Sequence, residues 1–225
     1  MKVNYIFHSS FLVETSHCYY IFDYFKGELP RMDKDKPVLV FSSHQHADHY
    51  NPEIFTLLKK EGFHRITAVL SKDIPPKRYP AEIPVVKVTF HETYTLPCQT
   101  SLKTLLSTDE GVAFLLSCPE GKIYHAGDLN DWVWEEESEQ YNKQMTGNYR
   151  HEIDLIQGEE IDLAFLPLDP RQGKDYARGI LYFLKKVRVG KVFPMHYWEQ
   201  PEVIKQFLGE YPEYREIIEY TEEYQ

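Results

Sequence analysis

The order of apolar and polar positions predicts short strands first and alternating strands and helices later. The opening strands are expected at 3–7, 11–14 and 18–23, where β-branched and aromatic residues are interrupted by Ser, Thr or His. A charged loop over 26–36 follows. Pro37 then opens the unbroken apolar run PVLVFSS, which is typical of a strand covered on both faces.

The remaining pattern adds helices between strands. A helix is predicted from Pro52 to Gly62, because Pro is favoured early in a helix and Gly at its end. Further strands are predicted at 66–70, 85–90, 102–106, 112–117, 122–125, 161–166 and 191–193, and further helices at 149–157, 175–186 and 201–210. No repeat, low-complexity linker or shift in composition divides the chain. We therefore expect a single domain over residues 1–225, of the α+β or α/β class.

Composition narrows the classes of function. The chain has 225 residues, of which 42% are hydrophobic, enough for one sizeable core. The 35 acidic and 25 basic side chains give a formal net charge of -10, which argues against a general nucleic-acid binder. The expected partner is a small-molecule substrate, and nothing in the sequence fixes the oligomeric state.

Cysteine usage and hydropathy point to a cytoplasmic protein. The three cysteines, Cys18, Cys98 and Cys118, are odd in number and lack CxxC spacing, so we expect free thiols in a reducing compartment. The first residues lack the apolar stretch of a signal peptide, and no segment approaches the ~20 apolar residues of a membrane span. We expect no association with a membrane.

The sharpest chemical feature is the loop His44-Gln45-His46-Ala47-Asp48-His49, which directly follows an apolar strand. It offers four potential ligands within six residues. Imidazole nitrogens and carboxylate oxygens are ligand types that zinc accepts, and residues spaced by two can reach one ion from a tight turn. A lone surface histidine would carry no such meaning, but this cluster predicts a metal site.

Two more candidates stand where other strands end. Asp128 follows the strand-and-glycine segment IYHAG, and His196 follows the apolar segment VFPM. Taken alone, Asp128 is as consistent with a turn residue and His196 with a packed histidine. Together with the loop they supply enough ligands for one or two ions.

These motifs resemble the metallo-β-lactamase superfamily, whose signature is H-x-H-x-D-H. His8-Ser9-Ser10-Phe11-Leu12-Val13-Glu14 resembles the family's opening hairpin, and Asp23 resembles the acidic residue that ends its early strand. The HQHADH loop is highly specific, and HAGD and PMH follow in the expected order. The resemblance implies an α+β fold, a four-layer αββα sandwich with the metal site at one edge of its sheets.

The resemblance also implies the roles of the ligands. His44 and His46 would hold the first metal, Asp48, His49 and His196 the second, and Asp128 would bridge them. The family usually adds a third histidine to the first site, but the matching stretch at 105–111 contains none, and His91 precedes the strand that aligns. The first site is therefore expected to use Asp109 or water, or to be empty.

The implied activity is hydrolysis of a small-molecule ester, lactone, amide or phosphoester. A metal ion lowers the pKa of bound water toward 7 and so supplies hydroxide at neutral pH, and Asp48 is expected to orient that water or move its proton. The cofactor is expected to be one or two Zn²⁺ ions, with Mn²⁺ or iron as alternatives. Three other functions remain open: a mononuclear or non-catalytic metal-binding module, a phosphodiesterase or nuclease, and a di-iron oxidoreductase, against which His46 argues.

Residues beside the ligand loops are candidates for the substrate pocket. The aromatic residues Trp132, Trp134, Tyr197 and Trp198 follow two of these loops, and Arg171 could clamp a carboxylate or phosphate. Core packing and pairing with Asp169 are the alternative interpretations. His125 is expected either to orient a ligand by a hydrogen bond or to pack in its strand.

Overall fold

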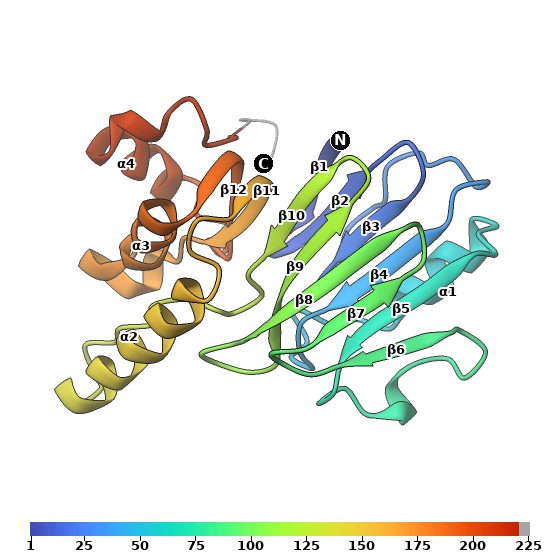
Figure 1. Ribbon diagram of the computed structural model, residues 1–225, viewed down its shortest axis with the longest axis horizontal. Coiled ribbons are helices and arrows are strands. Elements are labelled where there is room, and N and C mark those ends of the chain that lie inside the picture. The colour runs from blue at the N-terminus through green and yellow to red at the C-terminus, as the bar shows by residue number, and fades with distance from the viewer. Residues whose placement is uncertain (221–225) are drawn as a thin grey trace.

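Two six-stranded sheets pack against each other in the computed structural model, which describes residues 1–220 (Figure 1). The first sheet has its strands in sequence order: β1 (Lys2–Phe7), β2 (Ser10–Glu14), β3 (Tyr19–Phe22), β4 (Val38–Ser42), β5 (Ile66–Ser71) and β6 (Val85–Val88). The second sheet is ordered β12-β11-β10-β9-β8-β7. Its strands are β7 (Thr93–Leu96), β8 (Thr100–Leu106), β9 (Val112–Cys118), β10 (Gly121–His125), β11 (Glu160–Pro167) and β12 (Arg188–Met195).

Each sheet combines an antiparallel part with a parallel part. In the first sheet β1, β2 and β3 pair antiparallel, and β3 to β6 pair parallel. In the second, β7 to β10 pair antiparallel, and β10, β11 and β12 pair parallel. Parallel pairs need crossover connections, and three of them, β4 to β5, β10 to β11 and β11 to β12, each contain an α-helix, while a fourth helix follows β12.

Helices cover the outer faces of the two sheets. They are α1 (Glu53–Lys60), α2 (Glu139–Asp154), α3 (Arg178–Lys186) and α4 (Glu202–Glu210), with short 3-10 turns at Pro76–Arg78, Pro170–Asp175 and Pro212–Tyr214. In Figure 1, α1 lies beside the first sheet, and α2, α3 and α4 lie at the opposite side of the molecule. The result is the αββα sandwich expected from the sequence.

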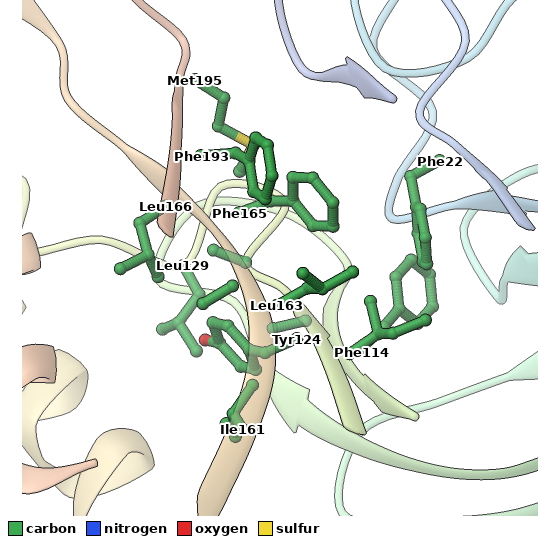
Figure 2. Close-up of a cluster of buried hydrophobic side chains, with 14 of the residues drawn as sticks. Phe22, Phe114, Tyr124, Leu129, Ile161, Leu163, Phe165, Leu166, Phe193 and Met195 are labelled. Atoms are coloured by element: carbon green, nitrogen blue, oxygen red, sulfur yellow. The ribbon is translucent and has the colours of Figure 1, made fainter. Parts of the chain in front are cut away.

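The packing follows from this layering. One large apolar cluster includes Phe22, Phe114 and Phe165, drawn from both sheets (Figure 2). The same cluster extends to Ile180 and Phe183 of α3. A smaller cluster under α1 joins Ile54, Phe55 and Leu58 to the other face of the first sheet. Burial on both faces explains why β4 is apolar at every position but its last.

Most predicted elements are confirmed; two differ in extent and one strand was not predicted. The helix predicted at 149–157 begins ten residues earlier, at Glu139, where Ser138 caps it by accepting a hydrogen bond from the Tyr141 amide. β12 extends beyond the predicted 191–193 in both directions. The edge strand β7 was not predicted, because three of its four residues remain at least partly exposed and carry little apolar pattern. Among residues 1–220, no helix is long and apolar enough to cross a membrane.

Candidate metal centre

The candidate site lies where strands of both sheets end. The chain leaves five strands at polar residues: Asp23 after β3, His44 after β4, Asp128 after β10, Asp169 after β11 and His196 after β12. The carboxyl ends of parallel strands are the usual place for ligand sites in α/β sheets. Here the two sheets bring their ends together, since His44 Nε2 lies 3.5 Å from Asp128 Oδ2.

The HQHADH loop is anchored to the first sheet by a buried carboxylate. Asp23 accepts hydrogen bonds from the Ser43 amide at 2.7 Å and from the Ser43 hydroxyl at 2.6 Å. The loop then closes on itself, because the His49 amide donates to the His46 carbonyl at 3.0 Å. These bonds hold His44 and His49 in fixed positions, and both side chains are fully buried.

Four side chains, of which all but Asp48 are buried, form a group that could hold one ion and is called the buried group below. They are His8, Asp48, His49 and His196, whose ligand atoms all lie within 4.8 Å of one another. His8 comes from the turn between β1 and β2, where its φ of 56° is in the left-handed region. Its Nε2 lies 3.5 Å from Asp48 Oδ2, so the opening hairpin contributes directly to the centre.

Three further side chains form a second group, with ligand atoms again within 4.8 Å of one another: His44, His46 and Asp128. His44 Nε2 and His46 Nδ1 lie 2.9 Å apart. His46 is more open to solvent than the other members of the two groups, with 45% of its side chain exposed. Asp128 connects the two groups, because its Oδ1 lies 3.1 Å from His49 Nε2 and 3.4 Å from His196 Nε2.

Two buried carboxylates stand behind the histidines of the buried group. Asp23 lies 2.7 Å from His49 Nδ1, and Asp169 lies 3.0 Å from His196 Nδ1. An imidazole that donates Nδ1–H to such a partner has its orientation fixed and presents the Nε2 lone pair to a metal. Asp169 is held in turn by the Arg171 guanidinium.

Charge at the centre is strongly coupled. Burial opposes ionisation of Asp128, but His49, His196 and His44 outweigh it and hold the pKa of this carboxyl well below its usual range. Burial also opposes the charged form of His49, yet Asp128 and Asp23 raise its pKa well above the ordinary value. For His8 and His44 burial is the leading cause, and the pKa of each imidazole is lowered.

Unpartnered atoms show that the donor set fits a divalent ion. Among the buried polar atoms of the described residues, His8 Nε2, His49 Nε2 and Asp128 Oδ1 have no hydrogen-bond partner. Such groups are costly unless something satisfies them. All three belong to the two groups above. Imidazole nitrogen and carboxylate oxygen are the ligand types of zinc and related ions.

The structure thus brings together all six residues expected to bind metal, in the pairing that the family resemblance implied. Sequence reasoning did not assign a ligand role to His8, although it stood in a motif already noted. The signal that could have indicated a ligand role for His8 was its position in the turn of the opening hairpin. His91, the other histidine considered for the first site, instead lies 2.9 Å from Glu152, and neither group includes it.

His125 braces the turns that carry the site. Its Nε2 donates to the Ser9 carbonyl at 2.9 Å, and its Nδ1 accepts from the Gly127 amide at 3.1 Å. Each partner is the neighbour of a site residue, His8 or Asp128. The histidine also stacks on Phe22 with ring centroids 5.0 Å apart, so it packs in its strand, and its hydrogen bonds hold the neighbours of His8 and Asp128 rather than a ligand side chain.

The candidate substrate residues fall in different environments. Trp132 is buried, donates from its indole to the Asp128 carbonyl at 2.9 Å and stacks on Trp134. Tyr197 is also buried and stacks on Tyr5 in the core. The exposed aromatic beside the site is Trp198, whose ring lies 4.4 Å from that of His8.

Arg171 lies against two of these aromatic rings. Its guanidinium carbon is 4.6 Å from the Trp198 ring centroid and 5.7 Å from that of Trp134. Its Nε also donates to both oxygens of Asp169 at 3.0 Å, so the pairing considered as its alternative role is present.

Comparison with known families agrees with this geometry. The family model for the beta-lactamase superfamily domain matches residues 2–196. The chain belongs to the metallo-β-lactamase superfamily. The matched segment begins in the strand before His8 and ends at His196, so it spans every residue of both groups. The sequence has no significant match among the curated proteins.

Solved structures share the fold at low identity. Igni18, a metallo hydrolase from Ignicoccus hospitalis, is 17% identical with a TM-score of 0.67, over 98% of this chain and 94% of that one. A metal-dependent hydrolase from Parabacteroides distasonis is 16% identical with a TM-score of 0.62, over 96% and 90%. CmlA from Streptomyces venezuelae, a diiron β-hydroxylase, is 12% identical with a TM-score of 0.54, over 99% of this chain and 48% of that one. These likenesses establish the fold and leave the reaction open.

Proposed function

We propose that this protein is a metal-dependent hydrolase of small molecules, with two Zn²⁺ ions as its cofactor. The observation that carries the proposal is the convergence of two ligand groups that meet at Asp128. Bound divalent ions lower the pKa of coordinated water and stabilise the negative charge that develops on a substrate oxygen. The candidate bonds are those of an ester, lactone, amide or phosphoester.

The residues of the chain supply position and proton transfer. Asp48 is the candidate to orient a water or accept its proton, because it is partly open to solvent, with 23% of its side chain exposed. Burial opposes ionisation of Asp48, but His8 and His49 outweigh it and lower its pKa, so the group is a carboxylate that can accept a hydrogen bond from water. Asp23 and Asp169 hold the orientation of His49 and His196.

The surroundings of the centre favour a small substrate over a nucleic acid. Asp109 and Glu110 lie beside His46 and add negative charge at the more exposed side of the centre. Arg171, the cation among the candidate substrate residues, is already paired with Asp169. A polyanion would meet repulsion here, in a chain whose net charge is -10.

The test is hydrolysis by protein depleted of metal and then reloaded. Chelation and dialysis should abolish turnover of nitrophenyl esters, lactones or bis-nitrophenyl phosphate, and added Zn²⁺, Mn²⁺ or Fe²⁺ should restore it. A matched set of assays with an oxygen electrode tests the di-iron alternative. Full turnover after metal removal would refute the proposal, as would metal-dependent oxygen uptake without hydrolysis.

A further inference from the structure

The loop between β8 and β9, residues 107–111, lies against both halves of the centre. The Val112 amide donates to the Ser43 carbonyl at 3.0 Å, which fixes the loop to the residue before His44. On the other side, the Thr108 hydroxyl donates to the Asn130 carbonyl at 2.7 Å. The loop is therefore anchored to the segments that carry His44 and Asp128.

Gly111 permits this close approach. Its φ is +72°, and a Cβ added there would lie 1.9 Å from the Ser43 carbonyl oxygen and 2.6 Å from the His44 Cβ. Only a residue without a side chain can adopt this conformation so near to the ligand loop. As a result Asp109 and Glu110, which precede Gly111, are placed beside His46.

The two carboxylates face different nitrogens of the His46 ring. Asp109 Oδ2 lies 3.9 Å from Nδ1, the nitrogen that approaches His44. Glu110 Oε2 lies 3.6 Å from Nε2, on the opposite side of the ring. Glu110 Oε2 is buried and has no hydrogen-bond partner among the described residues. The Nε2–H of His46 is the donor that would satisfy it.

We infer that Asp109 supplies the ligand that the first metal site otherwise lacks, and that Glu110 positions His46 by accepting a hydrogen bond from its Nε2. The inference rests on the proposed metal centre. Both histidines and Asp128 already converge there, and the Oδ2 of Asp128, a side chain that is 7% exposed, lies 3.5 Å from His44 Nε2. The site becomes one of two imidazoles and two carboxylates.

Glu110 thereby repeats an arrangement found at the buried group. Asp23 stands behind His49 and Asp169 stands behind His196, each at the ring nitrogen that faces away from the ligand group. His46 is more exposed than either, and its carboxylate partner comes from the loop of the other sheet.

The test compares Asp109→Asn and Glu110→Gln with Asp35→Asn, the same chemical change on an exposed loop outside the centre. Zn²⁺ stoichiometry and affinity are measured by calorimetry on the full chain. Asp109→Asn should weaken one of two ions by about 100-fold or more and leave the other unchanged, whereas Glu110→Gln should weaken the same ion by about 10-fold. Asp35→Asn should change neither.

Mn²⁺ provides a readout that is independent of turnover. An exchange-coupled pair in the wild-type electron paramagnetic resonance spectrum should become an isolated-ion spectrum in Asp109→Asn and persist in Glu110→Gln. Retention of both ions at wild-type affinity in Asp109→Asn would overturn the inference, as would equal weakening of both. If the ions behave as expected but no substrate is hydrolysed, the inference stands and the proposed hydrolase function fails.

Discussion

The two halves of the centre hold their ligand side chains in different ways. The buried half, His8, Asp48, His49 and His196, draws its ligands from three separate loops. Buried carboxylates, at 0% side-chain exposure, hold two of its histidines. The other half, His44, His46 and Asp128, is called the exposed half because it contains the half-exposed His46. It takes two histidines from one loop, and its carboxylates come from the second sheet.

The difference predicts unequal affinity for metal. A ligand held by a buried hydrogen bond loses little conformational freedom on binding an ion, whereas a half-exposed side chain such as His46 must be ordered first. We therefore expect the buried half to bind the tighter ion and the exposed half the more exchangeable one. The following changes test this contrast.

The largest effect is expected for Asp128→Ala, because this carboxylate contacts both halves. Its removal should lower the affinity for both ions by more than the ~10–100-fold typical of partners that do not touch the metal, and abolish turnover. Elemental analysis of protein purified without added metal measures the loss. A variant that keeps both ions would show that the halves are not joined through Asp128.

His8→Ala should weaken metal binding at the buried half alone. Because His8 belongs to the buried group alone, the tighter ion should weaken by about 100-fold while the exchangeable ion is unaffected. Competition with a chelator of known affinity measures both constants. Loss of the exchangeable ion instead would reverse the assignment of the two halves.

Gly111→Ala tests the close approach of the 107–111 loop to the ligand loop. Strain at a positive φ and contact with Ser43 should lower the free energy of unfolding by about 2 kcal/mol or more. Gly147→Ala is the matched control, since that helical glycine has nothing within 4 Å of an added Cβ, and it should raise stability by about 0.5–1 kcal/mol. Denaturant unfolding compares them, and equal stabilities would contradict the close approach.

Asp169→Asn should have the smallest effect of the four. The asparagine oxygen can still accept from His196 Nδ1, so the change removes the negative charge and part of the pairing with Arg171 but keeps this hydrogen bond. We expect about 10-fold weaker binding at the buried half, measured by the same chelator competition, with Asp35→Asn as the control. A loss as large as that of His8→Ala would mean that Asp169 does more than orient His196.

The same contrast explains what the sequence could and could not predict. The ligands of the HQHADH loop are contiguous, so their chemistry was visible without a structure. His196 directly follows a strand and Asp128 follows the glycine just after one, and these positions identified them. The partners Asp23, Asp169 and Glu110 are remote in sequence from the histidines they face, and only the pairing of strands and sheets brings them together.

The success of the fold prediction also depends on how strong the local sequence pattern is. Strands buried on both faces, such as β4, carry a strong local pattern, whereas the edge strand β7 and the first turns of α2 have mostly exposed side chains. Local pattern is weak where burial is slight. The position of His8 depends on a hairpin turn with a left-handed residue, which no periodicity reveals.

The most direct test of the two-part centre is a calorimetric titration of metal-depleted protein with Zn²⁺. The account predicts two ions per chain in two resolved steps, the first weakened in His8→Ala and the second weakened in Asp109→Asn. A single step in the wild type, or no binding, would contradict it.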